Sequence, residues 1–234
     1  MPDLPEESSS RAARILAAAG ELLLARGSKG VTVADVAARA HVGKGTVYLY
    51  WRTKEDLLLG LIGRDFLALA DEVTALVSVD PEIARPSRLC PSMLCIAAEH
   101  PFIAALQHSD NDLLGILAAD PRSARLLEIL GPDAVIRAIL PIWRDSGLAR
   151  TDWPLDDQVI ALQALTTGFV VAYKATPRPP VQDLTRVFAA AVTSLLGSEI
   201  STPQQLRTTA NGVRALIAEH RAGVLNLIDE QVSV

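Results

Sequence analysis

Apolar residues recur at intervals of three and four along most of this chain, and no stretch alternates between apolar and polar residues with a period of two. Ile15, Ala19 and Leu22 share one face of a helix that we expect to begin near residues 8–10 and to end at Gly27. Half of the residues are hydrophobic and 21% are charged, which provides enough apolar surface for a sizeable core. The pattern therefore predicts an all-α protein.

Two threonines mark the starts of further helices, because each is followed three residues later by an aspartate. Thr32 with Asp35, and Thr53 with Asp56, form capping boxes in which the shorter aspartate replaces the usual glutamate or glutamine. In a capping box, side chains accept hydrogen bonds from the free amides of the first helical turn. The second box opens a long predicted helix. The proline-containing stretch 78–92 that follows this helix is expected to be a connector.

Prolines and glycines divide the rest of the chain into further helices. Asp120–Pro121 and Thr202–Pro203 each place a capping residue before a proline at the first helical position. Two strongly apolar segments, 155–174 and 181–196, are separated by a proline-rich stretch. The organisation is that of a small helical module of about 65 residues followed, without a flexible linker, by a larger helical body.

Charge is distributed unevenly along the chain. The net charge is −5, but residues 10–54 carry eight Lys and Arg against two Asp and Glu, a local net charge of +6. A basic segment on an acidic body is typical of a surface that docks on phosphates. A solvated charged helix face would have the same composition, so the asymmetry by itself leaves both interpretations open.

The decapeptide VGKGTVYLYW, residues 42–51, contains three of the ten aromatic residues of the chain. On a helix, with 100° per residue, Val47 and Trp51 point in the same direction and are expected to be buried. Gly45 and Leu49 point in the opposite direction, toward solvent. The segment is therefore predicted to be a short helix with a buried tryptophan anchor and a glycine at its exposed crest.

The exposed side of this predicted helix has the chemistry of a DNA contact. A glycine at position 45 lets the backbone come close to base pairs, while Thr46, Tyr48 and Tyr50 can donate hydrogen bonds to phosphates. Lys44 adds a positive charge in the first turn. A helix of this kind suits the major groove.

Residues 14–58 resemble the helix-turn-helix domain of TetR-family transcriptional regulators. The positions that match the family pattern, identically or like for like, are Thr32, Val36, Ala37, Ala40, Val42, Gly45, Thr46, Val47, Tyr48, Tyr50, Trp51, Lys54, Glu55 and Leu57. The resemblance implies a helix-turn-helix DNA-binding domain over residues 9–69. It also implies a helical effector-binding and dimerisation domain over residues 70–234.

The residues expected to contact DNA are Thr32, Lys44, Gly45, Thr46, Tyr48, Leu49, Tyr50 and Lys54. Two positions depart from the family pattern, since His41 replaces the usual glycine and Gly43 the usual serine. Loss of that serine removes a helix cap, so we expect a looser start to the recognition helix. Leu49 stands where the family often has a polar residue, and it is expected to meet a thymine methyl group.

The resemblance further implies a homodimeric repressor that a small hydrophobic ligand releases from an inverted-repeat operator in double-stranded DNA. The dimer interface is predicted to contain Leu162, Leu165, Phe169, Leu184, Phe188, Ala191 and Leu195. Such an effector pocket is apolar with few polar groups. Our candidates for its lining are Met93, His100, Phe102, Gln107, His108, Trp143, Phe169 and Tyr173.

Two alternatives stay open: a helical protein-interaction adaptor, and a small all-α enzyme that does not bind DNA. The sequence has no glycine-rich phosphate loop and no nucleophile elbow, so we predict no catalytic residues and no cofactor. Cys90 and Cys95, and the spacing of His100 and His108 from nearby acids, match no compact metal motif, so we predict no metal. The acidic start, MPDLPEESSS, and the lack of a bilayer-length apolar run predict a cytoplasmic protein without membrane association.

Overall fold

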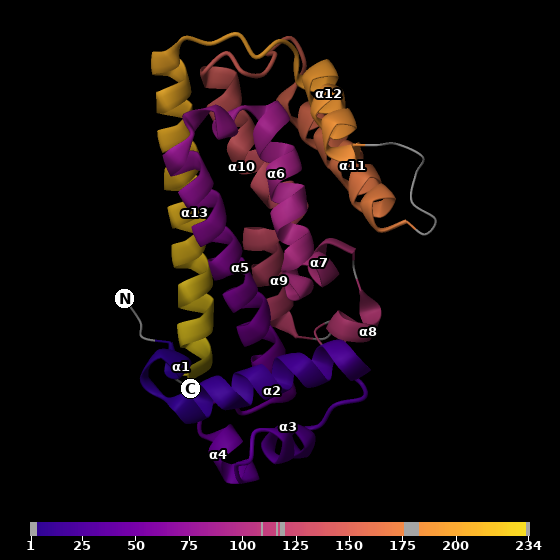
Figure 1. Ribbon diagram of the computed structural model, residues 1–234, viewed down its shortest axis with the longest axis vertical. Coiled ribbons are helices and arrows are strands. Elements are labelled where there is room, and N and C mark those ends of the chain that lie inside the picture. The colour runs from indigo at the N-terminus through magenta and orange to yellow at the C-terminus, as the bar shows by residue number, and fades with distance from the viewer. Residues whose placement is uncertain (1–3, 109, 116, 118–119, 176–182, 233–234) are drawn as a thin grey trace. The chain divides into compact units, whose positions relative to one another are not determined.

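The computed structural model describes residues 4–108, 110–115, 117, 120–175 and 183–232, and all regular elements of this part are helical (Figure 1). The elements are α1 (Pro5–Ser8), α2 (Ser10–Arg26), α3 (Val33–Arg39), α4 (Lys44–Tyr48), α5 (Lys54–Val79), the 3-10 helix η1 (Pro81–Ala84), α6 (Pro86–Glu99), α7 (Pro101–His108), α8 (Asn111–Leu114), α9 (Pro121–Leu130), α10 (Pro132–Asp145), α11 (Leu155–Lys174), α12 (Leu184–Leu196) and α13 (Pro203–Val232). The all-α prediction is confirmed. Among the described helices, none combines the length and the apolar character needed to cross a bilayer.

The chain forms two compact units. The first unit consists of Met1–Leu67, Pro101–Leu127 and Arg221–Val234, and the second of Ala68–His100 and Glu128–His220. The long helices α5 and α13 each contribute residues to both units. The functional division of the chain at residues 69 and 70 stays a prediction, because these units are defined by packing.

The predicted helix starts follow from local hydrogen bonding. The backbone N–H of Thr32 donates to Asp35 Oδ2 at 2.8 Å, and the backbone N–H of Asp35 donates to Thr32 Oγ1 at 3.3 Å, which is a complete capping box. Thr53 and Asp56 exchange the same two bonds at 3.0 and 3.1 Å at the start of α5. Bonds from Thr32 also lower the pKa of Asp35.

The predicted connector at 78–92 is wrong over much of its length, because α6 begins at Pro86 and continues through Pro91. A proline at the first helical position costs little, since its missing N–H would have had no helical partner. Pro91 lies inside the helix and is buried. Packing of α6 against α12 in the second unit compensates for the one helical bond that Pro91 cannot make.

The core of the second unit is built around large side chains from α10, α11 and α12. Trp143 is 1% exposed and its Nε1 donates to the backbone oxygen of Ala84 at 2.9 Å. Phe188 is fully buried, and its ring stacks on Phe169 with 4.6 Å between centroids. Helix α11 packs against both α10 and α12. These contacts account for the apolar character of 155–174 and 184–196.

The first unit combines α1–α4 with the start of α5, with α7 and α8, and with the end of α13. Val224 and Ile228 of α13 are buried there, and a methyl group placed on Gly63 of α5 would lie 2.8 Å from Ile228 Cδ1. Only a glycine permits an approach this close without a shift of the neighbouring side chain. The last turns of α13 are therefore part of the core that supports the N-terminal helices.

Candidate nucleic-acid interface

The turn between α3 and α4 is a Schellman motif with histidine in the left-handed position. His41 has a φ of 54°, its N–H donates to the backbone oxygen of Ala38 at 3.2 Å, and the N–H of Val42 donates to that of Ala37 at 3.0 Å. Glycine is the usual residue at this position, because a Cβ clashes with the backbone when φ is positive. The turn therefore forms with His41 at a position whose positive φ favours glycine.

Replacing His41 with glycine is expected to raise the free energy of unfolding. A left-handed conformation costs an L-residue about 1–2 kcal/mol, and the larger entropy loss of glycine offsets about 0.5–1 kcal/mol, so the net gain should be about 0.5–1 kcal/mol. Urea denaturation measures it. Ala38→Gly, at an exposed helical position in α3, is the control and should destabilise by about 1 kcal/mol. A loss of stability in His41→Gly would contradict the strain at His41.

Helix α4 begins at Gly43, which serves as its N-cap with φ −72° and ψ 150°. Because glycine has no side chain, the cap residue contributes only its backbone oxygen, which accepts from Thr46 N at 2.9 Å. The helix has five residues, and Leu49 continues it with αR geometry. A helix this short depends on tertiary anchors for its orientation.

Two buried side chains provide that anchorage. Val47 is fully buried and Trp51 is 2% exposed. Val47 lies on the side of α4 that helical geometry predicts to face the core, and Trp51 follows three residues after the last residue of α4. The opposite side of α4 is consequently fixed in its orientation to solvent.

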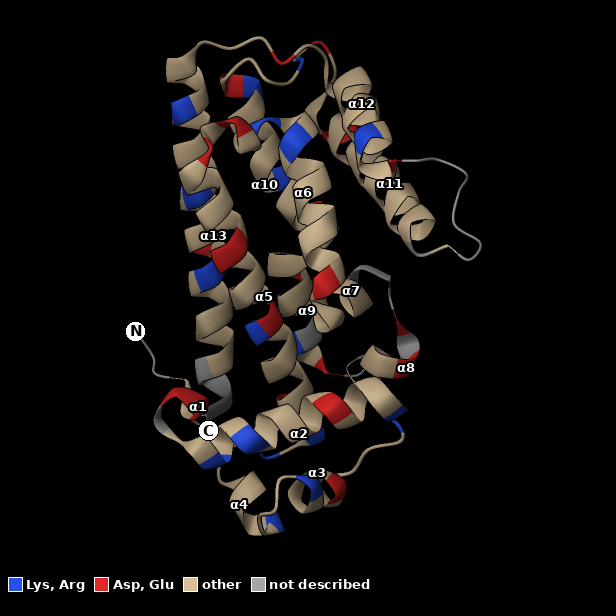
Figure 2. Cartoon of the chain, viewed as in Figure 1, with Lys and Arg blue, Asp and Glu red and all other residues tan. Residues whose placement is uncertain are grey.

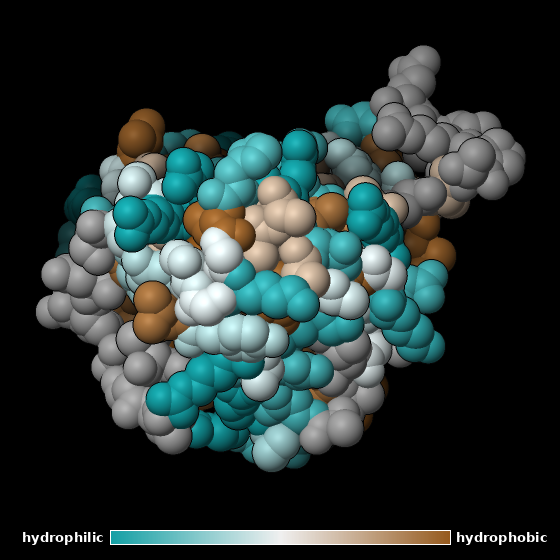
Figure 3. Space-filling view, turned by 90° about the horizontal axis from the view of Figure 1, so that it is seen from below, coloured by the Kyte–Doolittle hydropathy of each residue, from teal (hydrophilic) through white to brown (hydrophobic). Residues whose placement is uncertain are grey.

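The solvent-exposed side of α4 contains Gly45, and Leu49 directly after the helix is exposed as well, as predicted. Leu49 is 79% exposed and Tyr48 is 50% exposed, while a methyl group on Gly45 would meet open space among the described residues. Lys44 is exposed and Thr46 is half-buried. Figure 3 looks toward α3 and α4 from below, and most of the described surface in this view is hydrophilic or intermediate, with hydrophobic residues scattered among them. The surface of α4 combines a bare backbone, one cation and several hydrogen-bonding side chains.

The other three predicted contact residues make bonds within the protein. The Tyr50 hydroxyl bonds to Ser9 Oγ at 2.7 Å, which joins the end of α4 to the start of α2. Lys54 Nζ donates to the backbone oxygens of Ser28 and, at 3.0 Å, of Val31. Thr32 belongs to the capping box of α3. Their first role is to position the helices, and a DNA contact by any of them stays a prediction.

Basic residues lie on the helices of this region, and Figure 2 colours them blue on α2, α3 and α4. Arg11 and Arg14 on α2, Lys44 on α4 and Arg52 after Trp51 are exposed. Arg39 pairs with Glu21 at 2.5 Å, so its positive charge is largely compensated. Arg52 was not among the predicted contact residues. The sequence feature that could have identified it is its position directly after the buried Trp51.

The predicted effector residues are distributed over both units. His100, whose Nε2 lies 3.3 Å from Glu72 Oε1, and Trp143 are buried in the second unit, whereas Phe102 is buried in the first. Met93, Phe169 and Tyr173 are half-buried in the second unit. Gln107 and His108 end α7, and their side chains lie outside the described part of the structure. The effector site stays a prediction, although Trp143 and Phe169 already have partners in the core.

A small pocket lies elsewhere, in the first unit, among residues that sequence analysis did not select. Its lining consists of Leu59, Gly63, Arg122, Leu126, Val224, Leu227 and Ile228. These residues come from α5, α9 and α13, which are far apart in sequence. The arrangement could not be read from helical periodicity, because it depends on which helices meet.

The predicted dimer residues differ in their availability. Leu162 and Phe188 are fully buried within the protomer, so their side chains cannot contact a partner without rearrangement. The other five, Leu165, Phe169, Leu184, Ala191 and Leu195, are half-buried. Ile160, Ala164, Thr167, Gly168 and Val171 form an exposed stripe on α11, with Ile160 64% and Val171 62% exposed.

Neither cysteine has the properties of a nucleophile. Burial raises the pKa of the Cys90 thiol to about 12 and also raises the pKa of Cys95. A reactive cysteine needs the opposite shift, because the thiolate is the attacking species. Among the described residues, no three His, Cys, Asp or Glu side chains gather into a potential metal site.

Known proteins share this arrangement. Residues 15–61 match the profile of the family "Bacterial regulatory proteins, tetR family". The transcriptional regulator FadR from Bacillus subtilis, in a complex with stearoyl-CoA, is similar in structure, with a TM-score of 0.57 and 18% identity over 80% of this chain and 98% of that chain. The fatty acid degradation regulator FadR from Bacillus halodurans has a TM-score of 0.58 and 19% identity over 86% of this chain and 100% of that chain. No curated protein is a significant match.

The two structural similarities establish a shared fold, and the profile match covers α3, α4 and the turn that joins them. The match also includes the buried anchors Val47 and Trp51 and the exposed crest at Gly45. Residues 15–61 of this chain carry the helix-turn-helix domain described by the family "Bacterial regulatory proteins, tetR family".

Proposed function

We propose that the protein is a homodimeric repressor that binds an inverted-repeat operator in the cytoplasm and is released from it by a small hydrophobic ligand. The observation that carries the proposal is the exposed side of α4, where Gly45 lacks a Cβ and Tyr48 and Leu49 project into solvent. The buried side chains of Val47 and Trp51 fix this orientation from the core side. No internal packing role explains an exposed leucine next to an exposed tyrosine on so short a helix.

Helix α4 enters the major groove with its exposed side, at Gly45, toward the base pairs. Leu49 offers an apolar contact to a thymine methyl group, and Thr46 and Tyr48 offer hydroxyls to phosphates. Lys44 supplies the cation nearest to the backbone of the DNA. Arg11 and Arg52 are exposed, and each follows by two positions a residue of the Ser9–Tyr50 hydrogen bond. Both arginines extend the phosphate-binding surface.

A twofold symmetric dimer presents two copies of α4 to successive major grooves, about 34–36 Å apart. The exposed stripe on α11 is the surface that we assign to the dimer contact, together with the exposed Ala190, Thr193 and Ser194 of α12. Small residues at Ala164 and Gly168 permit close approach of a partner helix. Of the half-buried predicted residues, Leu165 and Phe169 adjoin Ala164 and Gly168 in sequence, and Ala191 and Leu195 adjoin Ala190 and Ser194.

The ligand acts by a shift of population. We expect the ligand to bind more tightly to a dimer conformation in which the two α4 helices are too far apart for successive major grooves. Such a ligand lowers operator affinity by the difference between its binding energies for the two conformations. The stearoyl-CoA bound to the similar FadR from Bacillus subtilis makes long-chain acyl thioesters the first class to test. Such ligands also have the apolar character that the sequence predicts for the effector.

The decisive experiment is a gel shift and nuclease footprint on DNA that flanks the gene of this protein, with and without stearoyl-CoA. A repressor protects an inverted repeat, and the effector releases it. An adaptor or an enzyme would retard no specific duplex. Retention of the complex with stearoyl-CoA would reject that ligand but leave the DNA-binding function intact.

Leu49 should determine one base of each half-site. We expect in vitro selection of operator sequences to show a thymine opposite Leu49, and Leu49→His to change the preference at that position. The remaining positions should keep their preferences, because Lys44 and Tyr48 are unaltered. An identical sequence preference for both proteins would show that Leu49 does not face a base.

Lys44→Ala should reduce the dependence of operator affinity on salt. Each lost phosphate contact lowers the slope of log K against log salt by about 0.9, so a dimer that loses two contacts should lose about 2. The matched control is Arg137→Ala on α10, because Arg137 is exposed and pairs with Asp133 and Asp156. Lys54→Ala is less suitable, since it also frees the carbonyls that Lys54 binds. An unchanged slope for Lys44→Ala would remove Lys44 from the interface.

A further inference from the structure

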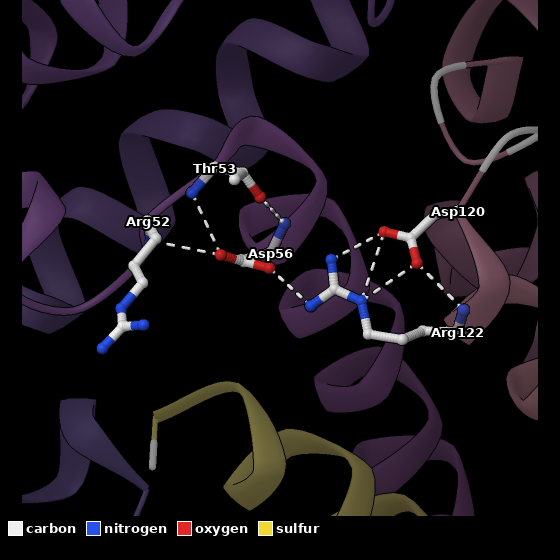
Figure 4. Close-up of polar contacts among 5 residues, drawn as sticks. All are labelled: Arg52, Thr53, Asp56, Asp120 and Arg122. Carbon is white, nitrogen blue, oxygen red and sulfur yellow. Dashed lines mark hydrogen bonds and ion pairs between the residues drawn. The ribbon is translucent and has the colours of Figure 1, made fainter. Parts of the chain in front are cut away.

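A chain of charged hydrogen bonds connects the first turn of α9 to the first turn of α5 (Figure 4). Arg122 Nη1 donates to Asp56 Oδ1 at 2.5 Å. On its other side, Arg122 donates to both oxygens of Asp120, from Nε at 3.0 and 3.2 Å and from Nη2 at 2.6 Å. Asp120 also accepts from the backbone N–H of Arg122 at 2.9 Å. The guanidinium is therefore held in one orientation by Asp120 and directed at Asp56.

The second oxygen of Asp56 binds the backbone that follows α4. Asp56 Oδ2 accepts from the N–H of Arg52 at 3.1 Å and from the N–H of Thr53 at 3.0 Å. Asp56 is 5% exposed, so its carboxylate needs a counter-ion in place of water. The side chain of Arg52 points away from this cluster in Figure 4 and uses only its backbone here.

The Arg52–Thr53 backbone directly follows Trp51, the anchor of α4. Helix α4 has five residues and a glycine cap, so its own hydrogen bonds constrain its direction weakly. Its orientation is set at one end by the His41 turn and at the other by Trp51 and the two amides bound to Asp56. Arg122 neutralises and orients the carboxylate that binds those amides.

We propose that Arg122 is a positioning residue for the DNA-reading helix, acting through Asp56 on the Arg52–Thr53 backbone. The proposal rests on the proposed function and names a residue through which that function is controlled. Residues 101–127 belong to the same compact unit as α4, so α9 contributes its first turns to the support of the reading helix. A shift of that turn separates Arg122 from Asp56 and loosens the backbone after Trp51.

Arg122 also lines the small pocket formed with Leu59, Gly63, Leu126, Val224, Leu227 and Ile228. The position of the guanidinium is therefore sensitive to the packing of α5, α9 and α13. Bonds from Arg122 lower the pKa of Asp120, and bonds from Asp120 raise the pKa of Arg122. Both groups therefore keep their charges at neutral pH.

Amide hydrogen exchange of the full-length protein tests the link without DNA. In Arg122→Met, which keeps an apolar stem for the pocket, the amides of Arg52 and Thr53 should exchange about tenfold faster, as expected for the weakening of a bond to a charged group. Amides of Val36 and Ala37 inside α3 should keep their rates. Arg137→Met, the control, should leave all four unchanged. Unaltered exchange at Arg52 and Thr53 in Arg122→Met would overturn the proposal, whatever the protein does with DNA.

A double-mutant cycle on the footprinted operator separates positioning from general stability. Arg122→Met should raise the dissociation constant by about tenfold in the natural background, and have little effect in Asp56→Asn, where the charge that Arg122 compensates is gone. Equal losses in both backgrounds would show that Arg122 does not act through Asp56. If no operator is found, the proposed function fails, while the exchange experiment still decides whether Arg122 controls this backbone.

Discussion

Trp51→Ala is expected to lower the free energy of unfolding by about 3–5 kcal/mol, the usual cost of removing a large buried aromatic side chain. Trp51 is 2% exposed, and it lies between α4 and the backbone bound by Asp56. Its removal leaves a cavity in the first unit and takes away the main anchor of a five-residue helix. Operator binding should be lost even under conditions where the variant remains folded.

Urea denaturation followed by far-ultraviolet circular dichroism measures this effect. Leu49→Ala is the matched control, because Leu49 is two residues away and 79% exposed. Its stability should stay within about 0.5 kcal/mol of the natural protein, although its operator preference changes. A small stability loss for Trp51→Ala, close to that of the control, would show that the tryptophan does not anchor α4.

Ala164→Arg is expected to convert the dimer into monomers and to weaken operator binding by about 100-fold or more, because two linked reading heads gain about 10²–10⁴ in avidity. Ala164 lies at the centre of the exposed stripe on α11, between Ile160 and Gly168. A symmetric contact places each new arginine near its copy in the partner, which adds repulsion and an unpaired buried charge.

Sedimentation of the natural protein and the variant measures the change in assembly. Ala215→Arg on α13 is the control, since Ala215 is also an exposed helical alanine in the second unit. It should leave the mass unchanged. Arginine is a good helix former, so both variants should fold. A dimer that persists in Ala164→Arg would place the contact on another surface.

The positions of the helix starts were predictable because their causes are local. Thr32 and Thr53 bind amides within three residues of themselves, and Gly27 ends α2 with a φ of 68°. The same reasoning was wrong at 86–92, where it treated two prolines as a connector. Burial of Pro91 and the packing of α6 on α12 outweigh local preference there, and neither is visible in a short stretch of sequence.

In the predicted interface, too, the features with local causes were predictable and those with tertiary causes were not. Helical spacing correctly placed Val47 and Trp51 inside and Leu49 outside, because one turn of helix determines which side chains share a face. It could not show that the Tyr50 hydroxyl meets Ser9, since these residues are 41 positions apart. Likewise, Leu162 and Phe188 were predicted to lie in the dimer interface, whereas both are buried within the protomer.

The sequence by itself determined the helical class, the caps, the family of the helix-turn-helix segment and the outward face of α4, since these depend on neighbours within a few turns or on a contiguous motif. Tertiary structure alone decided that α9 and the end of α13 support the N-terminal helices. It also decided that Arg122 reaches Asp56 across 66 positions of sequence. The physical reason is that buried charges and packed faces are chosen by partners that only the folded chain brings together.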